Sequence, residues 1–336
     1  MIVERFTALA KRYADLRVMV VGDLCLDRYM EIDPARTETS IETGLPVHNV
    51  LNVRAQPGGA GTVVANLVAL GVGRIDVVSY CGDDGEGYEL RRALSQMPGV
   101  CMDAFFCAAD RRTFTYCKPL LLEGDGPREL SRLDSKNWSP TPPELSHRLA
   151  EAVATLGAHA DGLIAVEQTD VPGTGVMTET VCAALGALAS ARLAVPMLAD
   201  SRRGLGAFPP LNFKMNDAEL AVLMGASSLP NQEAVRAAAV EWARRHGRST
   251  FVTLAEEGIV AAEPDGSVCH VPSLPLRGPI DIVGAGDSVT ANVTVALAAG
   301  ATTLEACRIA MAAASHTVHQ VGTTGAASTL DICALL

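Results

Sequence analysis

The segment from Asp281 to Ala298, DIVGAGDSVTANVTVALA, carries the residues best suited to chemistry, because a glycine-rich turn opens there into a long apolar helix. The first N–H groups of a helix have no partner inside it and carry the positive end of its dipole. The backbone of Gly284, Ala285 and Gly286 can therefore cradle a phosphate. Asp287 stands beside that anion site, where a carboxylate can accept a proton from an attacking hydroxyl. On spacing alone, Asp287 could instead be an acidic residue that merely favours a helix start.

The elements that must position this segment alternate between buried strands and helices. Parallel strands need crossover helices, so this alternation predicts a mainly parallel sheet with helices on both faces. The expected strands lie at 17–21, 75–81, 162–166, 195–199, 213–215 and 250–253. The expected helices lie at 2–14, 58–70, 217–224 and 281–298, with one more that runs through Leu188.

Two other stretches, 28–54 and 101–134, alternate polar and apolar residues without a helical period. Such alternation is typical of a sheet with one face in solvent, so we expect the two stretches to form one small lid sheet. The sequence shows no internal repeat and no low-complexity linker. We therefore expect a single domain over 1–336, with the lid as an excursion from it.

Composition excludes several classes of function. A formal net charge of -11 argues against a nucleic-acid or membrane-surface partner. No apolar run approaches the roughly 20 residues that span a bilayer, and the N-terminal residues do not resemble a signal peptide, so we expect a cytoplasmic protein. The nine cysteines include no CxxC pair, which favours reduced thiols over disulfides or a zinc site. The basic cluster 244–248 is typical of the last turn of a helix.

The segment around Asp287 resembles the GAGD motif of the ribokinase family, also called the PfkB carbohydrate kinases, in which the glycine turn is the anion hole and the aspartate is the catalytic base. The resemblance extends over nearly the whole chain. It implies an α/β ribokinase-like three-layer fold with a mainly parallel central sheet and a small β lid. It also implies a phosphotransferase with an alcohol group as acceptor. ATP and Mg²⁺ would be its cofactors, with a monovalent cation such as K⁺ as a further candidate.

The resemblance also implies residue roles. Asp27 would hold sugar hydroxyls, which suits an ionised carboxylate, although it could instead cap the end of a strand. The block that closes over the sugar matches Gly58, Gly59 and Asn66, and Glu167 would bind hydroxyls as in ribokinases. An NxxE block that helps to organise Mg²⁺ and phosphates matches Asn216 and Glu219, with Glu219 as metal ligand and with Thr253 and Gly258 as further nucleotide contacts.

Within this family, GDLCLDRY at 22–29, SIETGLPV at 40–47 and SRLD at 131–134 look most like the kinase domain of the D-glycero-D-manno-heptose-7-phosphate kinases. In many bacteria that domain is fused to an adenylyltransferase, a second domain that we do not expect here. The first expectation for the acceptor is a seven-carbon sugar 7-phosphate, and the alternative is a free sugar, as in ribokinases and fructokinases. We also expect a homodimer formed through the lid.

Several residues depart from the family pattern. Thr62, Val283 and Ala255 replace a usual asparagine, threonine and glycine. The stretch VEQTDVPG at 166–173 lacks the lysine that could meet a substrate phosphate in the heptose kinases. Other cations are candidates for that role, with solvated surface charge as the alternative reading: Arg111, Arg112, Lys118, Arg202 and Arg203.

Two other classes of protein stay open at this point. A catalytically silent sugar or nucleotide sensor with the kinase fold would account for the departures from the pattern. A Rossmann dehydrogenase would account for GGAGTVV at 58–64, but the third glycine of GxGxxG is missing and the turn does not follow the first strand.

Overall fold

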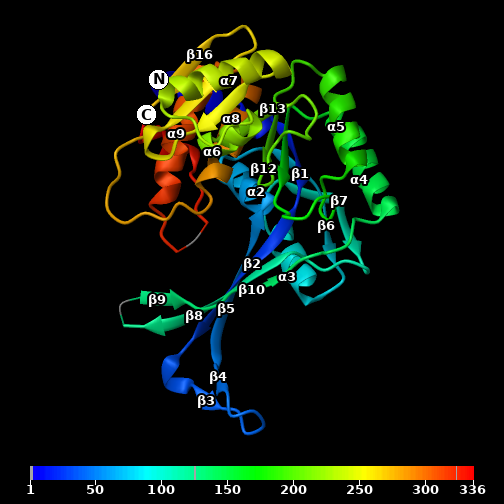
Figure 1. The fold of residues 1–336 in the computed structure, drawn as a ribbon, viewed down its shortest axis with the longest axis vertical. Helices are drawn as coiled ribbons and strands as arrows, with labels where there is room; N and C mark the ends of the chain where they lie inside the picture. Colours follow the sequence, from blue (N-terminus) through cyan, green and yellow to red (C-terminus); the bar gives the residue numbers. More distant parts are fainter. Residues whose placement is uncertain (1–2, 125, 323) are drawn as a thin grey trace.

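A computed structural model describes residues 3–124, 126–322 and 324–336 of the chain (Figure 1). Its centre is a nine-stranded sheet in which the strands from β14 to β7 run parallel, while β15 and β16 add an antiparallel edge. In spatial order the strands are β16 (Val268–Val271), β15 (Ile259–Ala262), β14 (Thr250–Thr253), β13 (Asn212–Asn216), β12 (Met197–Ser201), β11 (Gly162–Glu167), β1 (Arg17–Gly22), β6 (Arg74–Gly82) and β7 (Val100–Ala108).

Helices cover both faces of this sheet, which confirms the expected three layers. Each face has its own apolar core, with Leu149 and Leu185 in one core and Leu67 and Val295 in the other. The first core is formed with α4 (Pro143–Gly157), α5 (Glu179–Ala191), α6 (Asp217–Leu223) and α7 (Gln232–His246). The second is formed with α1 (Val3–Ala10), α2 (Ala60–Ala69), α3 (Gly85–Ser95), α8 (Ala285–Ala298), α9 (Thr303–Val318) and α10 (Thr329–Cys333).

A second sheet projects from the main body as the lid (Figure 1). Strand β2 follows β1 after the single residue Asp23, so the lid is attached directly to the central sheet. The lid strands are β2 (Leu24–Ile32), β5 (Val50–Gly59), β8 (Thr115–Glu123), β9 (Gly126–Glu129) and β10 (Leu133–Ser135). A short pair, β3 (Glu38–Thr39) and β4 (Pro46–Val47), lies at the far end.

The lid differs from the expected segments in one respect. The expectation that residues 101–134 all belong to the lid is wrong for the first part, because Val100–Ala108 forms β7 and pairs parallel with β6 in the central sheet. Phe105, expected on the lid, is 8% exposed and packs in the core. The first segment, 28–54, lies within the lid as expected, although its strands extend from Leu24 to Gly59.

The ends of two helices can be compared with the sequence predictions. Helix α7 carries Arg244 and Arg245 in its last turn and ends at Gly247, whose φ of 71° is left-handed. The helix expected at 2–14 is shorter, because α1 ends at Ala10 and a 3₁₀ turn follows. All nine cysteines are free thiols. Within the described ranges, no helix is both long enough and apolar enough to cross a membrane.

Candidate active site

The first turn of α8 lies at the carboxyl edge of the central sheet and begins at Gly284, whose φ of 84° is left-handed. No side chain caps this helix start. The Ala285 N–H donates to the carbonyl of Ile282 at 3.2 Å, so it is already used. Among the described residues, none accepts a hydrogen bond from the N–H of Gly286 or of Asp287. The N–H of Gly284 is likewise without an acceptor among these residues, so Gly284, Gly286 and Asp287 offer free donors for an anion, and of the three expected positions only Ala285 is engaged.

Asp287 follows this turn and has an unusual acidity. The pKa of its carboxyl group is raised to about 7, mainly by burial and also by the negative charges of Asp200 and Asp27, while the charge of Lys214 acts in the opposite direction. A carboxylate with a pKa near neutrality is a stronger base than an ordinary one and still loses its proton at physiological pH. Asp287 is thus suited to take a proton from a hydroxyl.

Lys214 is a member of this site that the sequence reasoning missed. It lies on β13, is 7% exposed, and places its Nζ 2.9 Å from Oδ2 of Asp200, which also accepts from the Thr290 hydroxyl at 3.1 Å. A Cβ at Gly286 would lie only 2.9 Å from the same Nζ, so a side chain there would push the Lys214 ammonium group aside. The ammonium group thereby stands beside the anion site. The available signal was a lone lysine in an apolar strand, two residues before Asn216.

Asn216 and Glu219 lie at the end of β13 and form the capping box of α6. The Asn216 side chain accepts from the Glu219 N–H at 2.8 Å, and the Glu219 carboxylate accepts from the Asn216 N–H at 2.8 Å. Burial raises the pKa of Glu219, and the charge of Asp200 adds to this effect. In the part of the chain that the structure describes, no three His, Cys, Asp or Glu side chains are grouped as a metal cage. A magnesium ion needs no such cage, because one or two carboxylates and the substrate phosphates commonly hold it.

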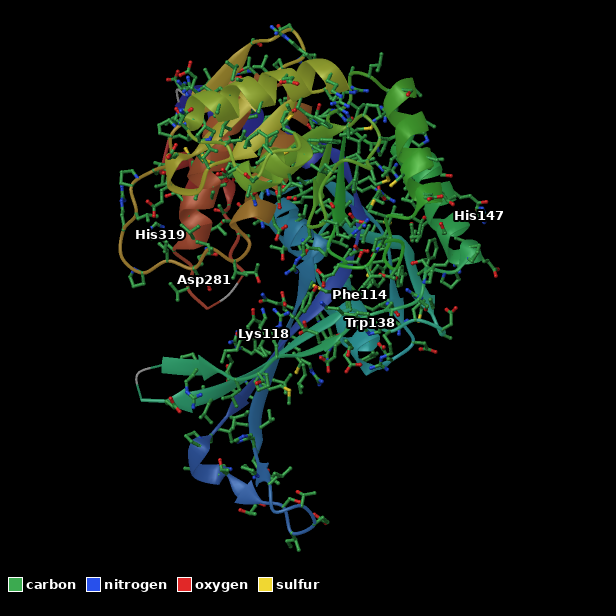
Figure 2. The ribbon with its side chains drawn as sticks, viewed as in Figure 1. Phe114, Lys118, Trp138, His147, Asp281 and His319 are labelled. Atoms are coloured by element: carbon green, nitrogen blue, oxygen red, sulfur yellow. The ribbon has the colours of Figure 1, made fainter. Side chains whose placement is uncertain are left out.

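On the opposite side, the lid presents Asp27 from the middle of β2. This position excludes the alternative that Asp27 caps the end of a strand. Its Oδ1 lies 3.3 Å from Nζ of Lys118, which also donates to the Tyr29 hydroxyl at 3.3 Å. A Cβ at Gly58 would lie 2.3 Å from the other carboxylate oxygen, so the glycine makes room for Asp27. Figure 2 shows Lys118 on the lid, where β8 approaches the main body.

Two residues expected to bind the sugar have partners within the protein. Glu167 is buried at the end of β11 and accepts from Ser201 at 2.6 Å and from the Arg203 guanidinium at 2.5 Å. Asn66 is buried inside α2, where its amide donates to the Thr62 carbonyl at 2.9 Å. The Oδ1 atom of Asn66, also buried, has no hydrogen-bond partner among the described residues.

The remaining expected nucleotide contacts lie around the turn between β14 and β15. The Thr253 hydroxyl donates to the Met215 carbonyl at 3.3 Å, and Gly258 has a φ of 94° and packs against the backbone of Val271. Ala255 has a φ of 48°, the sole positive φ of a non-glycine residue in the described ranges. This conformation explains why a glycine is usual at that position.

The candidate cations have different surroundings. Arg111 is 5% exposed and donates to the carbonyls of Ser139, Pro140 and Thr174, so it joins two backbone segments to its own. It is therefore not available to a substrate. Arg112 lies 3.6 Å from Asp84, and Arg203 pairs with Glu167. Lys118 lies beside Asp27. Arg202 is exposed and lies near Asp170.

The parallel sheet, the β lid and the aspartate behind a glycine turn together define a ribokinase-like sugar kinase fold. Residues 180–330 match the model of the pfkB family carbohydrate kinases. The chain is 33% identical over 326 residues to the bifunctional protein HldE of Rhodospirillum rubrum and 32% identical over 323 residues to that of Pelobacter propionicus. Both matches cover 94% of this chain and 62% of the relative. The chain is therefore similar to the pfkB family carbohydrate kinases over residues 180–330, and it spans less than two thirds of the length of the HldE relatives that it matches.

Solved structures agree with this fold. The ribokinase of Arabidopsis thaliana, complexed with ribose and ATP, superposes with a TM-score of 0.68 at 21% identity. Phosphofructokinase-2 of Escherichia coli, in complex with fructose-6-phosphate, superposes with a TM-score of 0.69 at 21% identity. Each comparison covers 95% of this chain and 98% of the other.

Proposed function

We propose that this protein is an ATP-dependent carbohydrate kinase that transfers the γ-phosphoryl group to a sugar or sugar-phosphate hydroxyl, with Asp287 as general base. The observation that carries the proposal is the position of Asp287 in a helix start with unused N–H donors, together with a pKa of about 7. A base and an anion site one residue apart fit phosphoryl transfer, in which a hydroxyl must lose its proton while negative charge is stabilised on the phosphate.

In the proposed reaction, Asp287 takes the proton of the acceptor hydroxyl as its oxygen attacks the γ-phosphorus. The new P–O bond forms, the bond to the β-phosphate oxygen breaks, and ADP leaves. The N–H groups of Gly286 and Asp287 and the ammonium of Lys214 stabilise the charge on the transferred group. Asp27 accepts hydrogen bonds from acceptor hydroxyls and fixes their position. Mg²⁺ would be held by Glu219 and Asp200 together with the phosphates, whose charge it neutralises.

For the acceptor, we propose a phosphorylated sugar, with D-glycero-D-manno-heptose 7-phosphate as first candidate. The relatives named HldE and the motifs at 22–29, 40–47 and 131–134 support this choice. The free-sugar alternative, as in ribokinases and fructokinases, has support in the ribose complex of a protein with the same fold. A catalytically silent sensor is a third possibility, against which the intact glycine turn and Asp287 argue.

ADP release measured over a panel of sugars and sugar phosphates tests these alternatives. We expect Mg²⁺-dependent release of ADP with at least one acceptor, and higher kcat/KM for a phosphorylated acceptor than for its free sugar. Equal or better turnover of the free sugar would instead favour a kinase of free sugars, as in ribokinases and fructokinases. Nucleotide binding without any turnover would favour the sensor. The same assay in KCl and in choline chloride measures the expected dependence on a monovalent cation.

We further propose that two subunits pair through their lids in the cytoplasm. The lid and its distal hairpin expose large apolar side chains, among them Ile41 at 99%, Leu45 and Val53. Such side chains in solvent favour association. Phe105 and Phe114, which also fall within the stretch 101–134 expected to form the lid, are instead buried and add nothing to this surface. A monomeric mass by light scattering at micromolar concentration would contradict the pairing.

A further inference from the structure

A small cavity of about 80 Å³ lies between the lid and the loop that follows β11. It is lined by aromatic side chains on one side and by polar side chains on the other. Figure 2 shows Phe114 and Trp138 close together where the lid meets the main body. Trp138 is 75% exposed, unusual for a tryptophan. Its lining includes Tyr116, Lys136, Trp138, Gln168 and Asp170.

The cavity continues from the proposed acceptor site. Tyr116 is paired with Asp27 across the ladder between β8 and β2, so both side chains lie on the same face of the lid. Gln168, on the wall of the cavity, lies close to Gly59 at the end of lid strand β5. A Cβ added at Gly59 would be only 3.0 Å from Cγ of Gln168. An acceptor whose reactive hydroxyl meets Asp287 and whose middle meets Asp27 can therefore extend into this cavity.

The wall formed by the loop is fixed in place by Asp23, a residue that the sequence reasoning did not single out. Its buried carboxylate accepts from the N–H of Gln168 at 2.9 Å, of Thr169 at 3.3 Å and of Val176 at 2.6 Å. A Cβ at Gly175 would collide with this carboxylate. The loop that carries Asp170 is thus anchored at both of its ends.

Three cations lie at or beside this cavity. Lys136 lines it and lies 2.6 Å from one oxygen of Asp170, while Arg202 stands beside it, 3.6 Å from the other oxygen. Arg132 binds Asp134 through two hydrogen bonds and lies 4.9 Å from the ring centroid of Tyr116. The charge of Glu129 also raises the pKa of Arg132, so three cations stand among three carboxylates. Cations held in this way can bind an anion that takes the place of one of these carboxylates.

We propose that this cavity is the seat of the acceptor's own phosphate, with Lys136 and Arg202 as its cationic ligands. Asp170, which is exposed, is the resident counter-ion that the phosphate displaces. The inference rests on the proposed kinase function and deepens it: the acceptor is a phosphomonoester long enough to reach from Asp287 past Asp27 to Lys136. Lys136 and Arg202 would then supply the positive charge that the stretch 166–173 lacks, where the heptose kinases carry a lysine.

Two neighbouring substitutions give opposite results under this proposal. Lys136→Met removes a phosphate ligand, so KM for sedoheptulose 7-phosphate should rise at least 10-fold, while KM for free sedoheptulose stays within twofold. Asp170→Asn removes the competing carboxylate, so KM for the phosphorylated sugar should fall. Lys11→Met, at an exposed lysine that follows α1, removes the same charge away from the cavity and should change neither value. If Lys136 and Asp170 merely hold the loop as an ion pair, both substitutions weaken acceptor binding together, and this outcome overturns the proposal.

Binding without turnover separates this inference from the proposed function. The chain has two tryptophans, and Trp242 is buried, so Trp242→Phe leaves Trp138 as the reporter at the cavity. Titration with sedoheptulose 7-phosphate in the absence of ATP should change its fluorescence saturably, and Lys136→Met in the same background should abolish the change. This result supports the seat even if no sugar is phosphorylated. A fluorescence that stays constant overturns the seat, even if the chain proves to be a kinase of free sugars.

Discussion

The first turn of α8 and the inner face of the lid each present one carboxylate to the same space, but their electrostatic surroundings differ. On the lid, Asp27 has a cation at 3.3 Å in Lys118. On α8, Asp287 forms no ion pair with any residue that the structure describes, and the nearby Lys214 is bonded to Asp200 at 2.9 Å. Burial and the charge of Asp200 then raise the pKa of Asp287 to about 7.

The difference shows how one fold can give two aspartates separate tasks. A carboxylate beside a cation stays ionised and accepts hydrogen bonds, which suits the binding of hydroxyls. A buried carboxylate beside another negative charge gains affinity for a proton, which suits a base. We therefore expect a change at Asp287 to affect turnover and a change at Asp27 to affect binding, and the predictions below test this division.

The largest expected effect is that of Asp287→Asn. Without a base, the acceptor hydroxyl keeps its proton, so kcat should fall on the order of 10²–10⁴-fold while ATP and sugar still bind. Steady-state ADP release and calorimetry measure the two quantities. Glu144→Gln, at an exposed acid in the first turn of α4, is a matched control and should leave kcat unchanged. Near-normal turnover in Asp287→Asn would falsify the proposed mechanism.

The second effect is that of Asp27→Ala, which should act mainly on binding. Loss of charge-assisted hydrogen bonds to the sugar, at about 1.5–3 kcal/mol each, predicts a Kd for the acceptor about 10- to 100-fold higher. The affinity for ATP should change little. Calorimetry with each substrate in turn gives both values. An unchanged sugar affinity would remove Asp27 from the acceptor site and leave Lys118 and Asp27 as a structural ion pair.

The third prediction uses pH to compare the two carboxylates. Asp287 works as a base only when ionised, so kcat/KM should rise about 10-fold per pH unit below about 7 and level off above that value. Because the charge of Asp27 helps to raise the pKa of Asp287, the midpoint in Asp27→Ala should move to lower pH. A midpoint that stays in place in this variant would show that the two carboxylates are electrostatically independent.

The sequence alone predicted the layered fold and the glycine turn at a helix start, because long apolar runs and helix starts are local features, while the chemistry at that turn stays a prediction. It did not distinguish β7 from a lid strand, since β7 is an edge strand in which most side chains are only half-buried. It could not identify the role of Lys214, whose importance comes from a strand and a helix 70 residues apart in sequence. Arg111 was misread for the same reason, because its carbonyl partners lie on distant segments.

The fourth prediction concerns the stability cost of the base. The folded pKa of Asp287, about 7, lies above the ordinary value of 3.8, so the native state binds more protons than the unfolded state between these values. Ionisation therefore destabilises the fold as pH rises through this window. Asp287→Asn should be more stable than the parent by on the order of a few kcal/mol at pH 8, because the largely buried carboxylate is little screened by solvent, and about equal at pH 4. Urea unfolding at both pH values measures this, and equal stability at pH 8 would contradict the raised pKa.

The smallest effect on stability is expected at Ala255, in the turn proposed to contact the nucleotide. There the free-energy cost to the fold comes from a strained backbone and not from a buried charge. Its φ of 48° costs an L-residue about 1–2 kcal/mol, whereas glycine adopts it freely. Glycine also gains entropy in the unfolded chain, worth about 0.4–1 kcal/mol, so Ala255→Gly should stabilise the fold by only about 0.5–1 kcal/mol. Ala158→Gly is the matched control, because Ala158 is also exposed but has a right-handed φ of -58°, and this change should destabilise. Urea unfolding of both variants gives the comparison, and destabilisation by both would show that the left-handed turn at Ala255 is not populated.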